Sequence, residues 1–93
     1  MIAALASAQE SNHLFIPIAG DAPGANGTHF RSDISIANLR DVDQRVLLVW
    51  RPSDGAIVAQ TTLIPAHGSL QSDNFVAEVL HGRGLGAVEI MAI

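Results

Sequence analysis

Residues 30–37 read Phe30-Arg31-Ser32-Asp33-Ile34-Ser35-Ile36-Ala37 and alternate between two sets of side chains. In an extended strand one face would hold Phe30, Ser32, Ile34 and Ile36, and the opposite face Arg31, Asp33, Ser35 and Ala37. A period of two is typical of a strand with one face on a core and one face in solvent, as in antiparallel sheets. This segment therefore predicts an antiparallel β protein.

The segments on either side also have strand character. His13–Ala19 is rich in β-branched and aromatic residues, and its Pro17, which cannot donate to a ladder, predicts an edge or an interrupted strand. Arg45–Arg51 is apolar on both faces, which indicates a strand that is covered on both sides. The turn Pro52–Gly55 should return the chain into Ala56–Ile64, so that the two strands form a hairpin.

One short helix is expected near the C-terminal end. An apolar stripe at the helical period is formed by Phe75, Val76, Val79 and Leu80. We predict a helix over Asp73–His81, with Gly82 ending it in the left-handed conformation. A last strand, Ala87–Ile93, follows.

Together these elements predict a mostly β fold: an antiparallel β-sandwich or open barrel with one short α-helix. The core is expected on the inward faces of the strands and the helix. Its predicted members are Phe15, Ile34, Ile36, Leu48, Leu63, Phe75, Val79, Leu85 and Val88.

The length of 93 residues is sufficient for one domain. We assign residues 12–93 to a single β-sandwich-like domain. Residues 1–11 are Ala-rich and contain the small-x-small triplet Ala6-Ser7-Ala8, as at the end of a signal peptide, but lack its charged start. This segment is interpreted as a leader remnant or as a flexible or docking N-terminal segment.

Composition excludes several classes of protein. A chain that is 48% hydrophobic and 15% charged does not belong to the disordered class. The absence of cysteine excludes disulfides and zinc–thiolate sites. A net charge of −4 argues against nucleic-acid binding. The sequence contains no run of about 20 apolar residues, so no membrane span is predicted. The four histidines lie far apart in sequence, so no metal site, no cofactor and no catalytic residue is predicted.

Several short motifs resemble a poorly characterised β-sandwich module of secreted and surface-exposed multidomain bacterial proteins. They are the Phe15-Ile16-Pro17 strand, the Pro23–Thr28 loop, the Phe30–Asp33 strand, the Ile64–Leu70 turn and the Gly84–Ile90 strand. The resemblance implies a β-sandwich with further strands beyond the last motif, so the chain would be a truncated copy. It also implies a secreted or cell-surface location, although the sequence leaves a cytoplasmic one open. The resemblance supplies no catalytic residues.

Two functions from different classes follow. The first is a non-enzymatic structural or protein-interaction module that self-associates through a sheet edge, most simply as a dimer. The predicted interface is the last strand, with Ala87, Val88, Ile90, Met91 and Ile93. The alternative is a small carbohydrate- or ligand-binding domain, in which Trp50 would stack on the ligand. Its other predicted ligand-binding residues are Phe30, Arg31 and Asp33.

Overall fold

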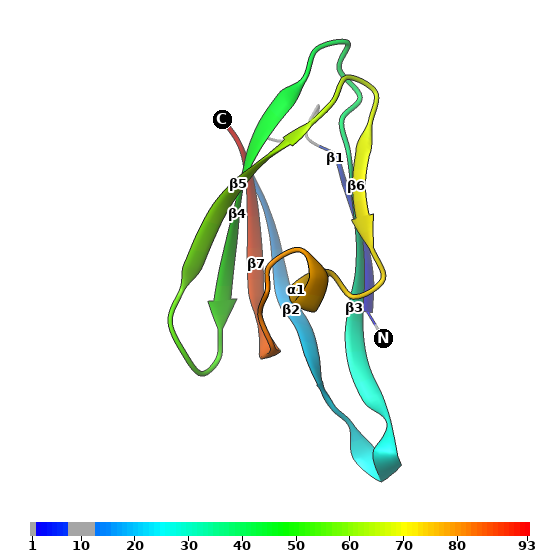
Figure 1. Ribbon diagram of the computed structural model, residues 1–93, viewed down its shortest axis with the longest axis vertical. Coiled ribbons are helices and arrows are strands. Elements are labelled where there is room, and N and C mark those ends of the chain that lie inside the picture. Colours follow the sequence, from blue (N-terminus) through cyan, green and yellow to red (C-terminus); the bar gives the residue numbers. More distant parts are fainter. Residues whose placement is uncertain (1, 8–12) are drawn as a thin grey trace.

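The computed structural model describes residues 2–7 and 13–93, which form a curled sheet with one helical turn on its inner side (Figure 1). The strands are β1 (Ile2–Ser7), β2 (His13–Pro23), β3 (His29–Ala37), β4 (Gln44–Pro52), β5 (Val58–Ile64), β6 (Ser69–Ser72) and β7 (Gly84–Ala92). The other elements are a 3-10 turn, η1 (Ala25–Gly27), and the helix α1 (Phe75–Glu78). Of the predicted N-terminal segment, residues 2–7 form β1, while residues 1 and 8–11 lie outside the described residues.

The strands follow the order β1-β3-β2-β7-β4-β5, and β6 pairs with β3 beside this path. β1 and β3 run parallel, and every other pair among the described strands is antiparallel. The sheet curls so that β4 and β5 lie across from β3 and β6, with α1 between them (Figure 1). This half-barrel with one short helix confirms the predicted mostly antiparallel β fold.

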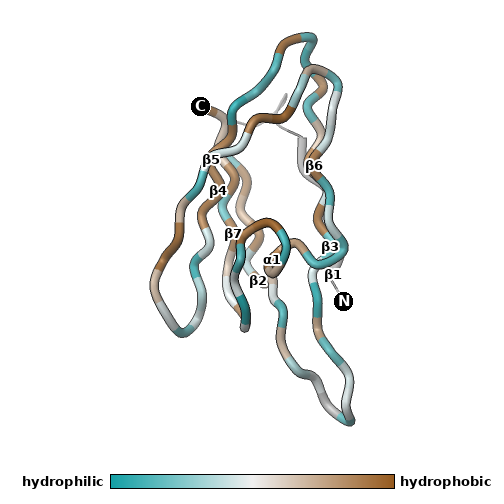
Figure 2. Tube along the Cα trace, viewed as in Figure 1, coloured by the Kyte–Doolittle hydropathy of each residue, from teal (hydrophilic) through white to brown (hydrophobic). Residues whose placement is uncertain are grey.

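The core fills the inner side of the curl, where α1 packs against β2, β3 and β6. It consists of Ala19, Ile34, Ile36, Val46, Leu48, Trp50, Ile64, Phe75, Val76, Leu80, Val88 and Ile90. In Figure 2 the tube at α1 is mostly coloured as hydrophobic, in agreement with its position between the strands. Five of the predicted core residues are confirmed as buried, namely Ile34, Ile36, Leu48, Phe75 and Val88, and Val79 packs against them partly buried.

Three predicted core residues are wrong, because they lie on the outer face: Phe15, Leu63 and Leu85. In each strand the buried set has the other parity, and a shift by one residue reverses the face of a side chain. Leu14 and Ile16 are the inward residues of β2, and Ile64 is the buried residue at the end of β5. Leu85 precedes Val88 by three positions, so an extended strand cannot point both residues inward.

The helix is shorter than the predicted Asp73–His81 and spans one turn, Phe75–Glu78. After it the backbone turn widens, since the Leu80 amide donates to the Phe75 carbonyl at 3.2 Å and the Gly82 amide to the Val76 carbonyl at 2.8 Å, spans of five and six residues. The left-handed residue at this end is His81, with φ of 55°, and not Gly82 as predicted. Gly82 instead allows a close approach, because a methyl group there would lie 2.6 Å from the Trp50 indole Nε1. The absence of a side chain at Gly82 therefore lets the segment after α1 pack closely on Trp50.

Candidate functional site

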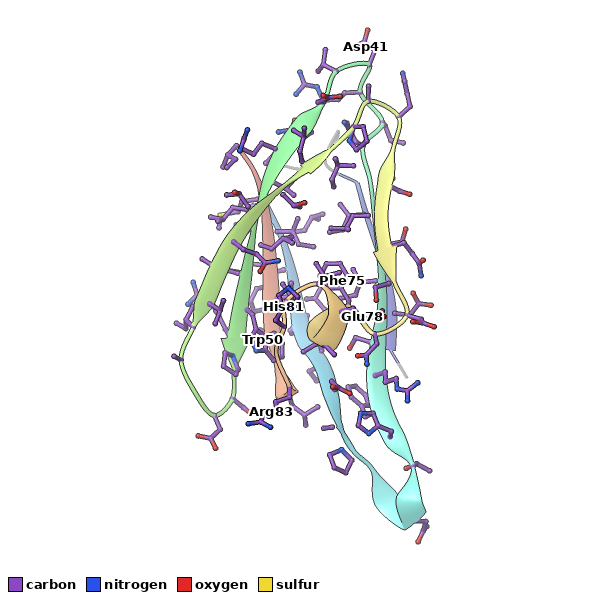
Figure 3. The ribbon with its side chains drawn as sticks, in the orientation of Figure 1. Asp41, Trp50, Phe75, Glu78, His81 and Arg83 are labelled. Atoms are coloured by element: carbon purple, nitrogen blue, oxygen red, sulfur yellow. The ribbon has the colours of Figure 1, made fainter. Side chains whose placement is uncertain are left out.

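Trp50 lies inside the half-barrel and cannot serve as a stacking platform. Its side chain is 2% exposed, and the segment through Gly82 and Gly86 covers the indole. Figure 3 shows Trp50 beside the segment that carries His81 and Arg83. A stacking platform needs one open aromatic face. The ligand-stacking role predicted for Trp50 is therefore wrong.

The other predicted ligand-binding residues lie on β3, which is separated from β4 by β2 and β7 in the sheet. Phe30 is half-buried near Gly20, and Arg31 is exposed. Asp33 accepts a hydrogen bond from Gln71 Nε2 of β6 at 3.0 Å. The structure therefore does not bring these residues together with Trp50.

The predicted interface strand, Ala87–Ile93, lies in the middle of the sheet. β7 pairs with β2 on one side and with β4 on the other, so its backbone is not a free edge. Val88 and Ile90 belong to the core, whereas Ala87 and Met91 are half-buried on the outer face and Ile93 is exposed. The prediction of an edge here is wrong, and the physical reason is simple: a strand with one charge in seven residues suits a position between two neighbours.

A small charged cluster lies on the outer face of the sheet. Glu89 of β7 accepts hydrogen bonds from Arg51 Nε of β4 and pairs with His13 Nε2 of β2, the latter at 2.8 Å. The Arg51 hydrogen bond, followed by that of His13, holds the pKa of Glu89 below its ordinary value. The cluster joins three neighbouring strands, and its geometry is that of a structural ion pair.

Because of this cluster, we expect part of the protein's free energy of unfolding to be lost in acid. Because the pKa of Glu89 is lowered by folding, its contribution to stability is complete above about pH 4.5 and is lost as the pH falls through the lowered value. In Glu89→Gln the free energy of unfolding should therefore fall less between about pH 5 and about pH 3 than in the wild type. Urea unfolding at a series of pH values measures this difference.

Arg51→Gln serves as the matched variant, since it removes the larger cause of the shift and keeps the carboxyl. It should also reduce the acid-dependent loss. If the free energy of unfolding of Glu89→Gln falls as steeply with decreasing pH as that of the wild type, the role given to this cluster is contradicted.

Among the other polar groups in the described part of the chain, His29 Nε2 of β3 and Asp21 Oδ1 of β2 form an exposed hydrogen bond. Within residues 2–7 and 13–93 no three His, Asp or Glu side chains come together as ligands for a metal ion. No helix in these ranges is long and apolar enough to cross a membrane. A cavity of about 310 Å³ is lined by Arg40, Gln44, Ala92 and Ile93, but its polar groups bond to one another, with Arg40 Nη1 donating to Gln44 Oε1 at 2.7 Å. We assign no ligand to it.

The two strands at the ends of the sheet order, β1 and β5, each have a strand neighbour on one side only among the described residues and contain neither a charge nor a proline; β5 is the longer of the two. Within the described residues β5 pairs with β4 alone, so one side of its backbone has no strand beside it. In an antiparallel pair alternate residues direct their N–H and C=O groups away from the partner. The edge of β5 therefore offers backbone donors and acceptors to a further strand.

The side chains of β5 do not protect this edge. Its sequence, Val-Ala-Gln-Thr-Thr-Leu-Ile, contains neither a charge nor a proline, the usual devices that block edge pairing. Val58 is 45% exposed, Leu63 is 52% exposed, and Ile57 just before the strand is 58% exposed. Figure 2 shows a hydrophobic stretch where the chain enters β5 from the β4–β5 turn. By contrast, β6 has only four residues and is followed by Asp73.

This edge was not singled out from the sequence, although its signal is present there. Residues 56–64 form an uncharged run of nine residues with good strand formers. Comparisons with known protein families, with curated proteins and with solved structures returned no match. The candidate site therefore depends on the geometry and chemistry of β5.

Proposed function

We propose that this protein is a non-enzymatic structural or protein-interaction module that self-associates through the edge of β5, most simply as a two-fold dimer. The observation that carries the proposal is the unprotected edge itself: β5 has seven uncharged residues and, among the described strands, a neighbour on one side only. Natural proteins normally block such an edge, because it pairs readily with another chain. Its presence supports a role in pairing.

The size of the domain supports the same proposal. A chain of 93 residues buries only about two-thirds of its unfolded surface, so a partner strand would add to a modest core. Among the described residues β5 and β6 do not pair, and β5 contacts the end of α1 only through a side chain, with Gln60 Nε2 donating to the Val79 carbonyl at 2.6 Å. A partner at β5 would extend the sheet without disturbing its existing ladder.

The resemblance to modules of secreted and surface-exposed bacterial proteins supports a location outside the cell or at its surface. Such a module would act outside the cell or at its surface, where assembly of repeated domains is a structural task. The charge of −4 makes nucleic acid an unsuitable partner.

The proposal is tested by the mass in solution and by a charge placed on the edge. Wild-type protein at tens of micromolar should sediment at twice the 9.8 kDa chain mass. Thr61 lies at the centre of β5 and is exposed, so Thr61→Lys should leave the fold intact and shift the protein to monomer. Ser69→Lys, at the exposed start of β6, is the matched control and should remain dimeric.

A wild-type protein that sediments as a monomer over this concentration range would overturn the proposal. A dimer that persists in Thr61→Lys would place self-association elsewhere on the molecule.

A further inference from the structure

We infer that the strand which completes the β5 edge is β5 of a second copy, in the antiparallel register that places Thr61 opposite Thr61. This inference rests on the proposed function and specifies the partner and its alignment. It predicts one continuous sheet across the dimer, in which β2, β7, β4 and β5 of one copy are followed by β5, β4, β7 and β2 of the other.

The first step of the argument is symmetry. A two-fold axis that pairs a strand with its own copy in an antiparallel sense is perpendicular to the sheet, so both copies keep their core faces on the same side. Opposed residues must then point to the same face. Every allowed register therefore places one residue opposite its own copy, and the choice is which residue of β5 lies on the axis.

The second step is the length of the ladder. β5 spans Val58–Ile64, and Pro65 directly after it has no N–H to donate. With Thr61 on the axis all seven residues of both strands are paired. With Gln60 or Thr62 on the axis only five are paired, so the Thr61 register forms the longest ladder.

The third step is the fit of the side chains. The Thr61 register has opposed pairs Val58–Ile64, Ala59–Leu63, Gln60–Thr62 and Thr61–Thr61. On the outer face the small Ala59 would lie beside the large, 52% exposed Leu63 of the other copy. Thr–Thr is a favourable cross-strand pair, and none of the opposed pairs joins two like charges. The register thus covers apolar surface at both ends of the junction.

Single cysteines test the register, because the chain has no cysteine of its own. Directly opposed residues of an antiparallel pair have Cα atoms about 4.5–5.5 Å apart, which is within the range for a disulfide. Thr61→Cys should cross-link to a covalent dimer under mild oxidation at least about tenfold faster than Ser69→Cys, because a dimer holds its two thiols at high effective concentration. Gln60→Cys and Thr62→Cys report the two neighbouring registers.

Each outcome decides a different point. Fastest cross-linking by Thr61→Cys supports the inference. Faster cross-linking by Gln60→Cys or Thr62→Cys would overturn the register, while self-association through β5 would stand. If none of the three exceeds Ser69→Cys and the wild type is still dimeric by sedimentation, β5 is not the interface. A monomeric wild type would overturn the proposed function together with this inference.

Discussion

Replacing Phe75 by alanine is expected to lower the free energy of unfolding by about 3–5 kcal/mol. Phe75 is fully buried and belongs to α1, which contacts β2, β3 and β6. Figure 3 shows its ring between the two groups of strands. A helix of one turn has no stability of its own in water, so this ring anchors the turn on the sheet. Truncation would leave a cavity at the centre of the half-barrel.

Phe15→Ala provides the matched control, because it makes the same chemical change at a side chain that is 57% exposed. It should change the free energy of unfolding by less than about 1 kcal/mol. Urea unfolding at one fixed protein concentration measures both variants, since association shifts apparent stability. Phe75→Leu, with a smaller loss, serves if the alanine variant does not fold. Equal effects of Phe75→Ala and Phe15→Ala would contradict this view of the core.

Much of the fold could be predicted because its signals are local. The alternation through Phe30–Ala37 matches β3 almost residue for residue, and the apolar run at Arg45–Arg51 matches β4. The pattern Phe75, Val76 and Leu80 identified the buried side of the turn around α1. What the local pattern does not contain is which strand lies beside which. β7 ends the chain, yet it pairs with β2 from the opposite end of the domain.

The site was harder to predict for this reason. Ala87–Ile93 is apolar apart from Glu89, a pattern that fits an interface strand as well as a central one, and long-range pairing places it at the centre of the sheet. Trp50 lies between an apolar residue and an arginine, and only the fold of the segment through Gly82 shows that its indole is covered. β5 has a hairpin partner, so its second, unpaired side becomes visible only once the sheet order is known.

Asn38 is a fully buried polar residue that joins the β3–β4 loop to the β5–β6 turn at one end of the half-barrel. Its two Nδ2 hydrogens are shared among the carbonyl oxygens of Val42 at 2.8 Å, Ile64 at 3.0 Å and Pro65 at 3.1 Å. Its Oδ1 accepts from the Arg40 amide at 3.0 Å. These bonds fix the turn after β3 against the turn after β5, and they satisfy backbone groups that water reaches poorly.

Asn38→Ala is therefore expected to lower the free energy of unfolding by about 2–4 kcal/mol, because it leaves several buried acceptors without a donor. Asn74→Ala is the matched control. Asn74 Oδ1 is buried without a hydrogen-bond partner among the described residues, so its removal should cost less than about 1 kcal/mol. Urea unfolding at neutral pH compares the two. Similar losses of unfolding free energy in both variants would show that the hydrogen bonds of the Asn38 amide do not stabilise the fold.

Asn38→Asp separates the donor role from the shape of the side chain. The carboxylate keeps an oxygen for the Arg40 amide but turns its second oxygen toward carbonyl oxygens, where only a donor fits. We therefore expect a loss at pH 7 at least as large as that of Asn38→Ala. Protonation restores an O–H donor, so the pKa of the introduced carboxyl is raised by folding and the difference from wild type should shrink as the pH falls. A difference that is independent of pH would mean that the three carbonyl oxygens do not need a donor at this position.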